Sequence, residues 1–108
     1  MSLWQRALVA RQIIGKQLNV LHLIYGRAAA SRDVDRACQR LRRWQALTAA
    51  RLTDNISPEI GQAFTKTGRD VAAVTDLDTL SHAHLVYQTF LYQLLEELKY
   101  SPENVLSP

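Results

Sequence analysis

Residues 34–52 read VDRACQRLRRWQALTAARL, a stretch in which two chemically different faces alternate with the period of a helix. At roughly 100° per residue, its apolar and small side chains gather on one face. They are Val34, Cys38, Leu41, Trp44, Thr48 and Leu52. A row of arginines gathers nearly opposite, consisting of Arg32, Arg36, Arg40 and Arg43. The pattern predicts an amphipathic helix, capped by Ser31 or Asp33 and ending near Leu52, that buries one face against other helices.

The segment before it, residues 3–29, has more apolar surface than one helical stripe. A core stripe recurs at intervals of three, four or seven, and comprises Ala7, Ile14, Leu18, Leu21, Tyr25 and Ala28. A second set lies on the adjoining arc, and comprises Val9, Ile13, Val20, Leu23 and Ile24. Together they cover roughly half of the helix, whereas a surface helix usually shows a stripe of about 100°. We therefore expect the second set to form an interface with another subunit.

Two further helices are predicted downstream. Ser57-Pro58-Glu59 supplies an N-cap, a proline at the first helical position and an acid at the positive end of the helix dipole. That helix is expected to end near Thr75, and a cap at Asp76, Asp78 or Thr79 opens a fourth.

Short connections between amphipathic helices favour antiparallel neighbours. The sequence thus predicts an all-α fold, an antiparallel up-down-up-down four-helix bundle with a long first helix, in one domain over residues 1–100. Part of the first helix should project beyond the core. Residues 101–108 are a C-terminal tail in which Ser101-Pro102-Glu103 repeats the start signal, but few residues follow. This tail is either frayed, or ordered by a partner or by a continuation of the chain.

Charge is divided unevenly along the chain. Residues 1–54 carry ten Lys or Arg and three Asp or Glu, whereas residues 55–108 carry three and seven, so a formal +7 half precedes a −4 half. Every basic residue from Arg27 to Arg51 is arginine, which favours forked contacts to phosphate or carboxylate. The arginine row is either solvated, paired with the acidic half, or used to bind an acidic protein surface or a nucleic acid.

The sequence offers no recognisable catalytic or metal-binding motif. His82 and His84 are two residues apart, so on a helix they point about 160° away from each other, whereas helical ligand pairs are three or four apart. His84 is interpreted as a core or edge histidine, and Cys38 as an inert thiol on a buried stripe. We predict no catalytic residue, cofactor or metal.

The function expected from these features is that of a non-catalytic helical protein-protein interaction module, an adaptor or small subunit. It is expected to form a homodimer, or to bind a protein partner, through the first helix. Leu85 and Tyr92, which lie off the main stripe of their helix, also suggest an interface. The alternative is a nucleic-acid-binding accessory subunit that uses the arginine row, and a third possibility is a hydrolase with an unrecognised site. Charged residues interrupt the apolar positions of the first helix, so we expect no membrane span and a cytoplasmic location.

Overall fold

The computed structural model describes residues 1–106, which form four α-helices and no strand. The helices are α1 (Leu3–Ser31), α2 (Val34–Asn55), α3 (Pro58–Asp70) and α4 (Leu77–Tyr100), followed by a short 3-10 helix, η1 (Pro102–Asn104). The predicted all-α fold is confirmed. None of the helices in residues 1–106 combines the length and apolar composition of a membrane-spanning segment.

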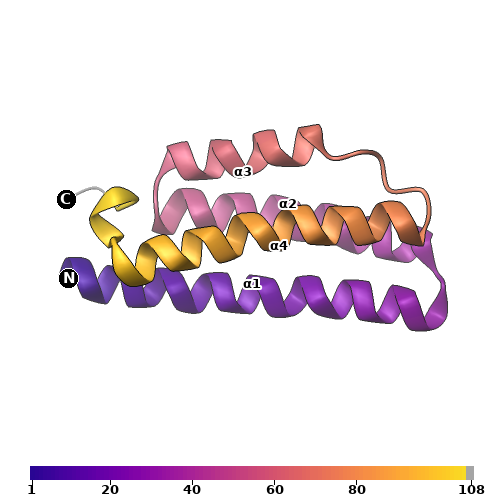
Figure 1. The fold of residues 1–108 in the computed structure, drawn as a ribbon, viewed down its shortest axis with the longest axis horizontal. Coiled ribbons are helices and arrows are strands. Elements are labelled where there is room, and N and C mark those ends of the chain that lie inside the picture. The colour runs from indigo at the N-terminus through magenta and orange to yellow at the C-terminus, as the bar shows by residue number, and fades with distance from the viewer. Residues whose placement is uncertain (107–108) are drawn as a thin grey trace.

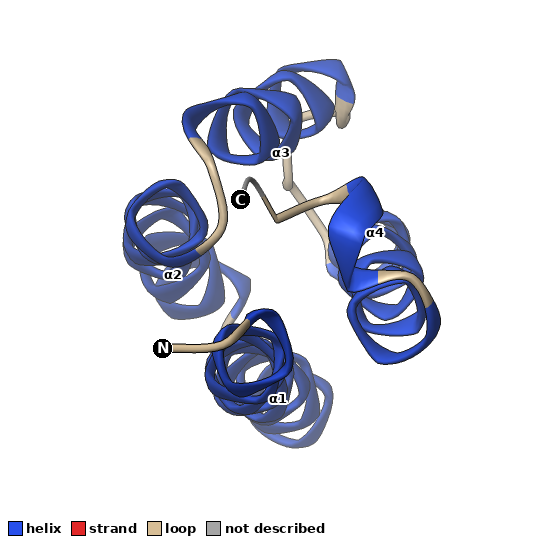
Figure 2. Cartoon of the chain, turned by 90° about the vertical axis from the view of Figure 1, so that its left-hand side faces the viewer, coloured by secondary structure: helices blue, strands red, loops and turns tan. Residues whose placement is uncertain are grey.

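The four helices lie side by side along the long axis of the molecule, and successive helices run in opposite directions (Figure 1). Viewed from the end, they occupy four corners, with α1 between α2 and α4 and with α3 on the far side (Figure 2). α1 packs extensively on both α2 and α4, whereas α3 packs mainly on α2. Within residues 1–106, no other helix of the chain therefore covers the outer surface of α1 (Figure 2).

Side-chain caps fix the starts of the helices. The Asp33 carboxylate accepts a hydrogen bond from the backbone N–H of Arg36 at 3.1 Å, so α2 begins at Val34. At the start of α4, the side chain of Asp76 accepts from the Thr79 N–H while the Thr79 hydroxyl oxygen accepts from the Asp76 N–H.

Two helix ends differ from the sequence prediction. α2 continues to Asn55 because the side chains of Thr53 and Asn55 donate to the carbonyls of Ala49 and Arg51, each at 2.9 Å, and so remain on the helix surface. α3 ends at Asp70, five residues earlier than predicted. Its last turn contains Gly68, a weak helix former, and the next residue after the helix, Val71, has an extended backbone.

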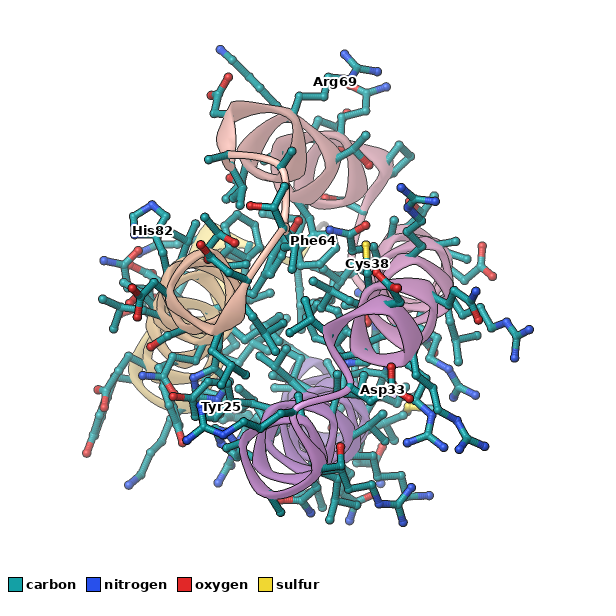
Figure 3. The ribbon with its side chains drawn as sticks, turned by 90° about the vertical axis from the view of Figure 1, so that its right-hand side faces the viewer. Tyr25, Asp33, Cys38, Phe64, Arg69 and His82 are labelled. Atoms are coloured by element: carbon teal, nitrogen blue, oxygen red, sulfur yellow. The ribbon has the colours of Figure 1, made fainter. Side chains whose placement is uncertain are left out.

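The core is centred on aromatic side chains from three helices. Trp44 of α2 packs edge-to-face on Phe64 of α3 and on Tyr87 of α4, with ring centroids 5.7 and 5.3 Å apart. All three are buried, and Phe64 points into the space between the helices in Figure 3. The Gln45 amide donates to the Tyr87 hydroxyl, and burial raises the pKa of that phenol.

The described part of the tail is ordered by its own chain, so neither alternative proposed from the sequence holds for it. Pro102 and Leu106 are buried, the Leu106 N–H donates to the Pro102 carbonyl at 2.9 Å, and η1 packs on α1 and α4. Ala7 and Ala10, on the first turns of α1, are likewise buried. The first turns of α1 therefore belong to the core and are not the part of the first helix that was expected to project beyond it. Residues 107–108 of the predicted tail lie outside the described residues.

Gly61 of α3 lies where α2 and α3 approach closely enough to leave no room for a side chain. A Cβ at this position would lie 1.9 Å from Thr53 Oγ1 and 3.2 Å from the Ala49 carbonyl oxygen. We expect Gly61→Ala to lower the free energy of unfolding by about 1–3 kcal/mol, as overpacked sites do, measured by chemical denaturation. Gly26→Ala is the control, because a Cβ there meets nothing within 4 Å. Gly26→Ala should raise the free energy of unfolding by up to about 1 kcal/mol, because alanine is the better helix former. Equal changes in the free energy of unfolding for the two substitutions would contradict the close approach of α2 and α3 at Gly61.

Candidate functional site

An apolar groove runs between the outer edges of α1 and α2. Its volume is about 280 Å³. α1 lines it with Gln17, Val20, Leu23, Ile24 and Arg27, and α2 with Arg40, Arg43, Trp44 and Leu47. A second hollow of about 410 Å³ shares Ile24, Arg27 and Arg40 with it and continues toward the α1–α2 turn. The structure thus brings the predicted interface stripe and part of the predicted arginine row onto one surface.

Buried hydrogen bonds hold the two walls of this groove in register. The Gln17 side-chain amide of α1 donates to the Thr48 hydroxyl of α2 at 2.6 Å. The Trp44 indole N–H donates to the Gln17 backbone carbonyl at 2.7 Å. Gln17, Thr48 and Trp44 are all buried. Because an unmatched polar group at any of these positions would be costly, the α1–α2 pairing is specific as well as apolar.

Most of the predicted interface residues remain accessible. Val9, Val20 and Leu23 are 39, 43 and 56% exposed, and Ile13 is half-buried. Ile24 is only 6% exposed, which corrects its assignment to an outer interface. It faces further toward α2 than the other four and joins the core of its own chain, leaving only an edge in the groove. Leu47, which is not among the predicted interface residues, adds a 48% exposed side chain from α2.

The arginine row is shorter than the sequence indicated. Arg36, Arg40 and Arg43 lie on α2, but Arg32 precedes the Asp33 cap. Arg32 has a left-handed backbone (φ 60°) and ends α1, because the chain must reverse direction there. Within residues 1–106, none of these four arginines forms a salt bridge with a carboxylate. The acidic half of the chain therefore does not neutralise the row inside the described part of the protomer.

A histidine pair that sequence spacing could not reveal lies on the other side of α1. His22 Nδ1 of α1 and His84 Nε2 of α4 are 2.7 Å apart, so one nitrogen donates a hydrogen bond to the other. The Tyr25 ring stacks on His84 at 4.8 Å, and the Tyr92 hydroxyl lies 3.5 Å from His22 Nε2. Burial, followed by repulsion from His22, lowers the pKa of His84. Both residues lie at the edges of their apolar stripes, but only the α1–α4 register places them together.

The other singled-out residues do not complete a catalytic or metal site. His82 is exposed and points away from the bundle in Figure 3. Cys38, predicted to lie on the buried stripe of its helix, is half-buried beside the α3–α4 connection. Among residues 1–106, no group of three or more His, Cys, Asp or Glu side chains could hold a metal ion.

Comparisons of this chain with protein-family models, with curated proteins and with solved structures gave no match. The functional proposal therefore rests on the residues and geometry of the chain itself.

The histidine pair predicts a specific loss of stability in acid. Because the folded state lowers the pKa of His84, unfolded chains bind more protons there, so folding becomes less favourable as the pH falls through about 6.5. We expect the urea midpoint to fall between pH 7.5 and pH 5, and to fall less in His84→Gln. His82→Gln is the matched control, and its urea midpoint should fall with pH as much as that of the natural protein. Parallel pH profiles for all three proteins would show that His84 does not contribute.

Proposed function

We propose that this chain is a non-catalytic helical interaction module, built as an up-down-up-down bundle with a long first helix, that self-associates through the outer surface of α1. The observation that carries the proposal is the α1–α2 groove, where Val20, Leu23 and Leu47 are exposed beside three arginines. Contiguous exposed apolar surface with a polar rim is typical of protein-protein interfaces.

The composition of the groove favours a protein occupant. Arginine is enriched in protein interfaces, where its apolar stem packs while its guanidinium pairs with an acid. Nucleic-acid interfaces are more polar and more strongly basic. A polyanion bound at the arginines would leave the neighbouring leucines in water. The preformed groove, held by the Gln17, Thr48 and Trp44 hydrogen bonds, also limits the conformational entropy lost on binding.

Self-association can be tested by sedimentation at micromolar protein concentration. We expect the natural chain to sediment as a species larger than a monomer, and Leu23→Glu to sediment as a monomer, because a carboxylate would have to be desolvated in the interface. Leu23 is more than half exposed, so this substitution should leave the helical circular dichroism and the unfolding midpoint nearly unchanged.

Gln62→Glu is the control for that experiment. It makes the same charge change on an exposed position of α3, remote from the groove, and should retain the association of the natural chain. A natural chain that remains monomeric throughout the micromolar range would contradict self-association.

A nucleic-acid-binding accessory subunit is the second candidate, favoured by the absence of salt bridges on Arg36, Arg40 and Arg43 within residues 1–106. At roughly 1.5 Å per residue, these three span about 10 Å of α2, enough to reach neighbouring phosphates.

This second candidate predicts a salt-dependent affinity for a nonspecific duplex. Replacing Arg36 and Arg40 together by Gln should reduce the slope of log affinity against log salt by roughly 2, since each lost phosphate contact removes about 0.9. Arg69→Gln with Lys66→Gln, which changes the charge equally on α3, is the matched control. Absence of binding at low salt would eliminate this candidate.

A further inference from the structure

We infer that the occupant of the α1–α2 groove is the outer face of α4 from a second copy of the chain, joined head-to-tail. This inference deepens the proposed self-association by naming the second surface. The side chains that line the α1–α2 groove include Arg27, Arg40 and Arg43 and no acid. A two-fold symmetric contact would place the same patch on both copies, and would therefore set arginine against arginine.

A complementary surface lies on α4 of the same chain. We call it the α4 outer stripe, and it consists of Asp78, Leu85, Tyr92 and Glu96. At roughly 100° per residue, these four positions fall within about 40° of one another on the helix. Leu85 and Tyr92 are 54 and 48% exposed, and both acids are exposed. The stripe is thus apolar at its centre and acidic at its two ends. Lys99 lies about one turn beyond Glu96, with its ammonium 5.1 Å from the centroid of the Tyr100 ring.

The two surfaces also match in spacing. Along α1, Arg27, Val20, Ile13 and Val9 follow one another at intervals of seven, seven and four residues. Along α4, Asp78, Leu85, Tyr92 and Glu96 follow at the same intervals in the opposite chain direction. In both sets the first and last residues are 18 positions apart, which is about 27 Å of helix at roughly 1.5 Å per residue.

An antiparallel contact between α1 of one copy and α4 of the next therefore aligns the chemistry position by position. Arg27 meets Asp78, Val20 meets Leu85, and Ile13 meets Tyr92. Arg40 and Arg43 from the α2 wall flank the Asp78 end of the incoming helix. Glu96 then lies beside Val9, beyond the residues that line the groove and toward the part of α2 that carries Arg51. The contact combines apolar burial with opposite charges.

A single copy can use both surfaces at once. α2 and α4 lie on opposite sides of α1 in the end view of Figure 2, and no residue of the α4 outer stripe lines the groove. A contact between two different patches is heterologous, and it produces a closed ring or an open chain of copies according to the rotation between neighbours.

Complementation between two blocked variants tests the inference. Leu23→Glu blocks the groove and keeps the α4 outer stripe, whereas Leu85→Lys blocks the stripe and keeps the groove. Each variant alone should be monomeric in sedimentation, while an equimolar mixture should form a one-to-one heterodimer and nothing larger. The natural chain should form species beyond the dimer, or a ring of more than two copies. Gln62→Glu and Gln62→Lys are the charge-matched controls and should both assemble like the natural chain.

The outcomes separate the inference from the proposed function. If the natural chain forms a dimer that Leu85→Lys leaves intact, or if the mixed variants do not associate, the α4 outer stripe is not the occupant, although self-association through α1 stands. If the natural chain is monomeric at all concentrations, both fail.

Disulfide trapping tests the register. In a Cys38→Ser background, Val20→Cys combined with Leu85→Cys should give an oxidised ladder of dimers, trimers and larger species, because each copy offers one thiol to either neighbour. Replacing Val20→Cys with Gln12→Cys, an exposed α1 position outside the stripe, should abolish the ladder. A ladder of equal yield from both pairs would contradict the register.

Discussion

Trp44 is the side chain on which the arrangement of all four helices depends. Its indole ring lies on α2 and packs edge-to-face against Phe64 of α3 and Tyr87 of α4, while its N–H donates to the Gln17 carbonyl of α1. Tryptophan combines a large apolar surface with one directional donor, so it fixes the rotation of α2 as well as filling the centre. The hydrogen bond from Gln17 to Thr48 sets the register of the same helix pair. Because Trp44 also lines the α1–α2 groove, the core and the proposed binding surface share one determinant.

That shared determinant explains why the groove is open. Trp44 and Thr48 turn one side of α2 inward, which leaves Arg40, Arg43 and Leu47 at the margin that faces α1. On α1, the buried stripe is divided between α2 and α4, so Val20 and Leu23 remain outside both contacts. With α3 on the far side of the bundle, no element in residues 1–106 covers this margin (Figure 2). The exposed apolar surface is thus a consequence of the helix order and not of loose packing.

The sequence predicted those features that depend on one helix at a time. The faces of α2, the start of α3 at Pro58 and the excess apolar surface of α1 follow from periodicity and capping, which are local. Features that depend on two helices required the structure. The burial of Ile24 and the His22–His84 pair are set by the α1–α2 and α1–α4 registers. Leu106 is covered because the start of α1 lies beside the end of α4 (Figure 1). Arg32 was assigned to the arginine row because its spacing fits the helical period of α2. In the structure the helix does not extend back to Arg32, which instead ends α1.

In the proposed assembly, the uneven division of charge along the chain places basic residues on one contact surface and acidic residues on the other. Exposed arginines on a lone protomer are solvated and screened over about 8 Å at physiological ionic strength, so they cost the fold little. When a partner covers the leucines between them, that solvation is lost, and only an acidic edge on the partner restores the balance. The first half of this chain supplies the basic groove and the second half supplies the acidic stripe. A protein that associates with itself through such surfaces needs opposite charges on different faces of one copy, since a self-complementary basic patch would repel its own image.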